Sequence, residues 1–118
     1  MNPAARLQAT HDLLYEVESA ARPADAVTSG WFRDRRHIDD SDRGAILDLL
    51  YTLLRHRARL GWWLARQNHD ASPRYRLLAW LVLGEGKTPD QVERLFDAPP
   101  LTRAEHSLLA GLRGCTVT

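Results

Sequence analysis

The sequence predicts an all-α fold of about six helices joined by short loops. Apolar residues recur at spacings of three and four along most of the chain, as expected when one face of each helix is buried. Capping residues, prolines and glycines separate these stretches at the positions where helices begin and end. No segment alternates apolar and polar residues with period two, and no Asn-Gly or Asp-Gly hairpin turn occurs. The length of 118 residues predicts one domain, residues 1–118.

The first two helices are predicted from their ends. Asn2 is an N-cap and Pro3 is tolerated at the first helical position, so a helix of about five turns begins there. Pro23 ends it, because the residue before a proline is disfavoured in helical geometry, and opens a second helix over residues 23–36. Gly30 lies inside this second helix at a cost of about 1 kcal/mol. We therefore expect another element to pack close to it.

Residues 41–68 predict the longest helix, around which the other elements are expected to pack. Ser41 is the expected N-cap, with Asp42 at the positive end of the helix dipole. Arg57 falls within the apolar stripe and is expected to be structural: either it pairs with a buried acid, or the helix bends near it. Gly61 favours the bend. The apolar stripe consists of Ile46, Leu49, Leu50, Leu53, Leu60 and Leu64.

Three shorter helices are predicted after this one. The first is apolar nearly all round, which predicts a central place in the core, with Trp80 buried. Gly84 ends the first, residues 98–100 end the second, and Gly114 ends the third. Each is expected to begin at a Ser or Thr N-cap: Ser72, Thr88 and Thr102.

Composition and motifs limit the function classes. The net charge is only +1, so the chain as a whole is not a polycation that would bind any nucleic acid indiscriminately. The single Cys115 excludes an intramolecular disulfide and a cysteine metal cluster, and no signal peptide or membrane-spanning run is present, which together predict a cytoplasmic protein. The five histidines lack a metal-binding i, i+4 pair, so a metal-dependent phosphohydrolase is the last alternative. No catalytic, metal-binding or cofactor-binding residue is predicted.

Arginines are concentrated in the middle of the chain. Eight of them lie within residues 33–66, and the chain has a single lysine, Lys87. Guanidinium groups on adjacent helical turns suit phosphate contacts, and Trp62, the one tryptophan expected to be exposed, could add base stacking. The alternative is a solvated helix face paired with acids such as Asp39 and Asp40. A coding bias towards arginine would also explain the composition. These alternatives stay open at the level of sequence.

The sequence resembles a known family at specific residues. The run DRGAILDLLYTLLRHRARLGWWL resembles the central helix of the NusB-like domain, with Asp42 and Arg43 at its start, Leu50 and Tyr51 in its middle, and the Arg-His-Arg of residues 55–57 before a leucine. The opening ARLQATHDLLYEVESAARPADAVTSGWFRDRR resembles the version found at the N-terminus of RsmB/Sun-type 16S rRNA cytosine-C5 methyltransferases. The resemblance covers essentially the whole chain.

The resemblance implies two small helical bundles that bind RNA, often together with a protein partner. In the methyltransferases this domain precedes a catalytic domain that uses S-adenosylmethionine and two cysteines. The motifs of that domain are missing here, so the chain is expected not to methylate by itself and to be either an N-terminal fragment or a separately encoded domain. An ending soon after a helix favours a natural chain that continues past Thr118. The adjacent acids Asp39 and Asp40 argue against strong affinity. The matching positions implied to contact RNA are Arg6, Arg33, Arg35, Arg36, Arg43, Arg55 and Arg59.

The function expected from these observations is a non-catalytic accessory domain. It would bind ribosomal RNA and position it for a separate methyltransferase domain, without a cofactor of its own. The alternatives are a protein-interaction module that uses exposed apolar surface such as Trp62, or a transcription antitermination factor of the NusB type.

Overall fold

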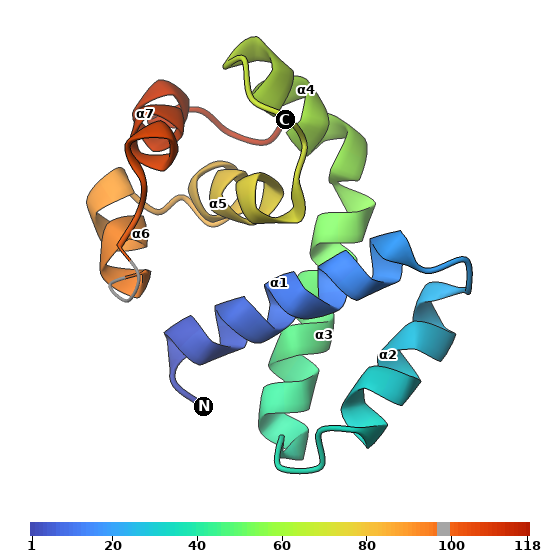
Figure 1. The fold of residues 1–118 in the computed structure, drawn as a ribbon. Helices are drawn as coiled ribbons and strands as arrows, with labels where there is room; N and C mark the ends of the chain where they lie inside the picture. The colour runs from blue at the N-terminus through green and yellow to red at the C-terminus, as the bar shows by residue number, and fades with distance from the viewer. Residues whose placement is uncertain (97–99) are drawn as a thin grey trace. The chain divides into compact units, whose positions relative to one another are not determined.

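The computed structural model describes residues 1–96 and 100–118, and this part of the chain is all-helical (Figure 1). The predicted all-α fold is confirmed, with seven helices and no strand among the described residues. The chain divides into two compact units, Met1–Thr52 and Leu53–Thr118. The helices are α1 (Pro3–Ser19), α2 (Ala24–Arg33), α3 (Asp40–Arg55), α4 (Arg57–Arg66), α5 (Pro73–Leu83), α6 (Pro89–Leu95) and α7 (Arg103–Leu112).

The first unit contains α1, α2 and most of α3. The side chain of Asn2 accepts a hydrogen bond from the backbone N–H of Ala5 at 2.7 Å, which confirms it as the N-cap of α1. Helix α2 ends at Arg33, three residues earlier than predicted. Gly30 has no atom of another described element within 4 Å of the position that a Cβ would take, so the expected close packing there is wrong.

The buried carboxylate of Asp42 joins α3 to the start of the chain. Asp42 is 5% exposed and accepts hydrogen bonds from Arg6 Nε at 2.6 Å and from the terminal amine of Met1 at 3.2 Å. The hydrogen bond from Arg6 lowers the pKa of Asp42; burial opposes this shift, and the terminal amine reinforces it. The cap of α3 is Asp39, whose carboxylate accepts the backbone N–H of Asp42 at 2.8 Å, and not Ser41 as predicted.

The long helix predicted over residues 41–68 is two helices. The interruption is at His56, whose backbone (φ −98°, ψ 15°) lies outside regular helical geometry. The imidazole of His56 stacks on the Trp80 ring at 4.8 Å between centroids. The interruption directly precedes Arg57, so the expected bend near that residue is confirmed, five residues before Gly61. Arg57 itself is exposed, so its placement in the buried apolar stripe is wrong.

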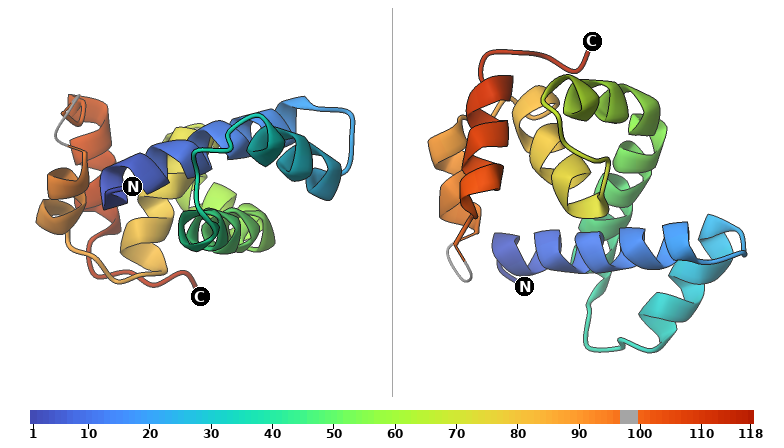
Figure 2. Two further views of the ribbon diagram at one scale, coloured as in Figure 1. Left: turned by 90° about the horizontal axis from the view of Figure 1, so that it is seen from below. Right: turned by 45° about the horizontal axis from the view of Figure 1, so that its top comes forward.

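In the second unit, α5 contacts α4, α6 and α7 (Figure 2). Most of its side chains are buried, as predicted from its nearly uniform apolar character, although Trp80 is only half-buried. Arg74 donates two hydrogen bonds to the Glu105 carboxylate of α7, at 2.7 and 3.3 Å. Burial raises the pKa of Glu105, but Arg74 and the backbone of Thr102 outweigh it, so the pKa lies below its usual value.

The predicted starts of the last three helices are confirmed. Ser72 caps α5 through the N–H of Tyr75, and both Thr88 and Thr102 form capping boxes with the residue three positions later. Gly84 follows α5 directly, and Gly114 follows α7 with φ 77°, a conformation that glycine adopts without strain. The breaker predicted at residues 98–100 falls mainly on Ala98 and Pro99, which lie outside the described residues.

Candidate nucleic-acid interface

The most basic element of the chain is α4. Between Asp48 and Asp70 the sequence carries four arginines and no acidic residue. By sequence the second unit has ten Lys and Arg against six Asp and Glu, whereas the first unit has six against nine. The net charge of +1 is therefore the sum of a basic second unit and an acidic first unit. The exposed arginines of this stretch are Arg55, Arg57, Arg59 and Arg66.

The exposed face of α4 places an indole between two guanidinium groups along the helix. Trp62 is 46% exposed. Arg59 and Arg66, three residues before it and four after it, lie over its ring at 5.1 and 4.8 Å from the centroid. This i, i+3, i+7 spacing brings all three side chains to one helix face. We refer to Arg59, Trp62 and Arg66 as the α4 cluster.

The C-terminal segment fixes one side of the α4 cluster. Val117 accepts hydrogen bonds at its carbonyl oxygen from Arg59 Nε at 3.1 Å and from the indole N–H of Trp63 at 3.4 Å. Its own N–H donates to the carbonyl of Leu83 at the end of α5. Trp63 in turn meets Trp62 edge to face, with centroids 5.0 Å apart. The cluster is thus held by contacts outside α4 as well as within it.

Two of the five arginine candidates of the first unit are engaged with aromatic rings. Arg35 lies 4.0 Å from the Trp31 ring centroid and donates a hydrogen bond to the carbonyl of the same residue at 3.1 Å. Arg43 of α3 lies 4.9 Å from the Phe32 ring, and this ring meets Trp31 edge to face. Both guanidinium groups therefore help to pack α2, whatever else they contact.

The other three candidates of the first unit differ in availability. Arg6 is held in its ion pair with buried Asp42. Arg33 and Arg36 are exposed and make no side-chain hydrogen bond or ion pair within the described residues. Exposed Asp34, Asp39 and Asp40 lie close to them in sequence. Arg33 and Arg36 are thus the freest of the five candidates in a unit that is acidic as a whole.

The second unit gathers the remaining candidates on or beside α4. Arg55 ends α3 and is exposed, and Arg59 belongs to the α4 cluster. Arg66 is missing from the candidates inferred from sequence, although its position four residues after Trp62 is a signal that the sequence contains. Because Trp62 is exposed, this spacing places Arg66 on the same exposed face of the helix.

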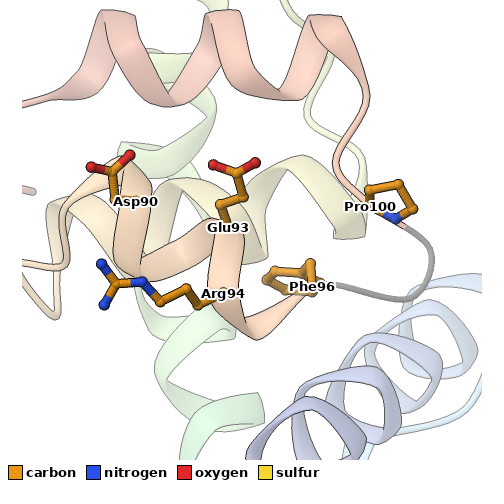
Figure 3. A pocket seen from close by; sticks show the side chains of 5 residues that line it. All are labelled: Asp90, Glu93, Arg94, Phe96 and Pro100. Atoms are coloured by element: carbon orange, nitrogen blue, oxygen red, sulfur yellow. The ribbon is translucent and has the colours of Figure 1, made fainter.

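An open pocket of about 440 Å³ among the described residues of the second unit adjoins α6, where the side chains of Asp90 and Glu93 point to the same side and Arg94 extends along the helix (Figure 3). Asp90, Glu93 and Arg94 are exposed, so neither carboxylate has the apolar surroundings of a catalytic acid. Glu93 also lies 3.7 Å from His106 Nε2. A second pocket, about 370 Å³, is lined by Val82, Gly86, Lys87, Thr88, Arg113, Gly114 and Cys115.

Two of the histidines contact aromatic rings. His56 stacks on Trp80, and His69 meets Tyr75 edge to face. Among the described residues, no three His, Cys, Asp or Glu side chains are grouped as a metal site requires. In the same part of the chain, no helix is both long and apolar enough to cross a membrane.

No protein-family model, no curated protein and no solved structure matches this chain.

Proposed function

We propose that this chain is a non-catalytic RNA-binding domain of the NusB-like kind, which positions ribosomal RNA for a separate cytosine-C5 methyltransferase domain. The observation that carries the proposal is the acid-free basic surface of α4 with an exposed tryptophan at its centre. Guanidinium groups contact phosphates, and an exposed indole offers a stacking surface for bases. The accessory role rests on the family resemblance in the sequence.

The second candidate function is docking of a protein, and the exposed Trp62 is the observation that favours it. Exposed tryptophan and arginine are common anchors of protein interfaces. The charge of the surrounding helix favours RNA: a protein surface facing four arginines without an acid would have to be strongly acidic. RNA supplies that charge on every nucleotide.

A salt series separates the two functions. We expect the chain to bind ribosomal RNA hairpins with an affinity that falls steeply between low and moderate salt, because bound phosphates release counterions. For the four arginines around α4, a log–log slope of about −3 is expected if all contact single-stranded phosphates. Absence of binding at low salt would reject the proposal. A protein partner bound with little salt dependence would support the alternative.

The accessory role has its own test. An RNA cytosine-C5 methyltransferase catalytic domain fused after Thr118 should methylate a ribosomal RNA fragment at lower RNA concentration than the same domain alone. The expected change is in KM, with little change in kcat, because the proposed role is binding and positioning. An unchanged KM for a fusion in which both parts are folded would reject the accessory role, but not RNA binding itself.

A further inference from the structure

We infer that the α4 cluster is a site for an unpaired nucleotide, whose base stacks at Trp62 while Arg59 and Arg66 contact phosphates on either side. This inference rests on the proposed RNA-binding function and specifies the ligand: single-stranded or looped RNA, and not a paired duplex. It depends on the geometry of three side chains of α4.

Trp62 differs from the other tryptophans of the chain. Trp31 is 7% exposed, and Trp63 and Trp80 are half-buried against Val117 and His56. Trp62 is 46% exposed, although burying an indole is favourable and neighbouring apolar surface is available at Trp63. Its edge-to-face contact with Trp63, which is itself bonded to Val117, restrains the ring in this exposed position. Little side-chain freedom is therefore left to lose on binding.

The arginines of the cluster are placed for phosphates on both sides of a stacked base. Arg59 and Arg66 are seven residues apart, which is about 10 Å along the helix axis. In the free chain their guanidinium groups lie over the indole. A base that enters over the ring displaces a guanidinium group from it. The displaced guanidinium can then bind a phosphate, which is a stronger partner for it than an exposed ring. Arg59 can contact a phosphate through its terminal nitrogens while its Nε atom keeps the hydrogen bond to Val117.

A paired duplex does not fit this arrangement. The bases of an A-form helix are stacked on each other, and its deep major groove excludes side chains. An indole on an exposed helix face reaches only the backbone and the shallow groove of a duplex. Unpaired bases in loops and single strands can turn outwards and stack on an aromatic ring. The cluster therefore selects for unpaired nucleotides, whereas the surrounding arginines alone would bind both forms.

The test compares two RNAs and three variants by fluorescence anisotropy at one salt concentration. The RNAs are a labelled unpaired oligonucleotide and the same strand paired with its complement. We expect Trp62→Ala to weaken binding of the unpaired strand by about 5- to 150-fold, the range for loss of one base–aromatic stack. Trp62→Phe should retain most of the affinity. Tyr15→Ala, which removes an aromatic side chain that is 58% exposed on α1, should have no effect.

The outcomes distinguish the inference from the function on which it rests. If the unmodified chain binds neither RNA at low salt, the proposed function fails and the inference fails with it. If the duplex binds as tightly as the single strand, or if Trp62→Ala changes affinity less than twofold, RNA binding stands and the stacking site is rejected. Circular dichroism of each variant checks that the helices are intact. The affinity of Trp62→Ala for the duplex is the internal reference, because the arginines that bind a duplex are unchanged in this variant.

Discussion

The Nε atom of Arg59 lies 3.1 Å from the carbonyl oxygen of Val117, and this hydrogen bond joins α4 to a residue 58 positions later in the chain. The same carbonyl accepts the indole N–H of Trp63, and the N–H of Val117 donates to Leu83. The C-terminal segment therefore joins α4 to the end of α5. The exposed side chain of Arg59 and the packing of the second unit are thus linked at one carbonyl group.

Trp63 should stabilise the fold through its hydrogen bond to the Val117 carbonyl, whereas Trp62, which lacks such a bond within the described residues, should not. Trp63→Phe keeps an aromatic ring but removes the hydrogen bond to Val117, and we expect the free energy of unfolding to fall by about 1 kcal/mol. The matched control is Trp62→Phe, because the Trp62 indole N–H has no hydrogen-bond partner within the described residues. We expect a change below about 0.5 kcal/mol for the control. Urea unfolding of both variants provides the comparison, and equal losses would contradict the expected difference.

Asp42 should make the first unit sensitive to acid. Its pKa is lowered in the folded chain, so it stabilises the fold above the unfolded pKa of about 3.9 and loses this contribution as pH falls through the folded value. We expect Asp42→Asn to lower the thermal midpoint at neutral pH and the difference from the unmodified chain to vanish in strong acid.

Asp48→Asn is the control for this experiment, because Asp48 is exposed on the same helix and its carboxylate makes no ion pair within the described residues. Its thermal midpoint should follow that of the unmodified chain at every pH. A loss in Asp42→Asn that persists at low pH would show that packing, and not charge, is responsible.

Two glycines should respond to alanine in opposite directions. Gly30 lies inside α2 with free space at the Cβ position, so Gly30→Ala should stabilise the chain by about 0.5–1 kcal/mol. At Gly84 a Cβ would overlap the Trp80 ring, which is also stacked on His56 and cannot move without loss of that contact. Gly84→Ala should therefore destabilise by about 1–3 kcal/mol. Thermal unfolding of the two variants measures both signs.

Charge reversal at the end of α3 and in α4 should weaken RNA binding without unfolding the chain. Arg55 and Arg66 are exposed and make no hydrogen bond or ion pair within the described residues, and the Trp62 ring over which Arg66 lies is itself exposed, so Arg55→Glu with Arg66→Glu should leave the buried core intact. We expect an affinity loss of tenfold or more and a salt slope shallower by about 1.4, because each phosphate contact on a single strand contributes about 0.7. Arg59 is avoided, because its reversal would also break the bond to Val117.

The matched control reverses the same number of charges elsewhere in the second unit, at Arg94 of α6 and Arg103 of α7, both exposed. If this control weakens RNA binding as much as the α4 variant does, net charge alone governs affinity and α4 is not the interface.

Helix starts were predictable because a cap is a local interaction. Asn2, Ser72, Thr88 and Thr102 each accept a hydrogen bond from a backbone N–H three residues later, so the residues that decide the helix start lie within one turn. Ser41 shows the limit of this argument: Asp39, two residues earlier, is an equally good cap, and the choice between them depends on where Asp42 is buried.

The interruption at His56 could not be predicted in this way. Its imidazole stacks on Trp80, 24 positions further along the chain, and no local residue type marks the break. Because each residue of a helix turns about 100°, restarting the helix after one irregular residue changes which side chains share a face. Arg57 is exposed at the first position of α4, whereas Leu60 and Leu64, further along the same helix, are buried.

The sequence by itself determined the helical class, most helix ends and the concentration of arginines around α4, because each of these depends on residues close together in the chain. The tertiary structure decided where the central helix divides and which arginines are already engaged. Those outcomes depend on contacts between distant residues, such as Arg59 with Val117 and Arg6 with Asp42, that periodicity does not encode.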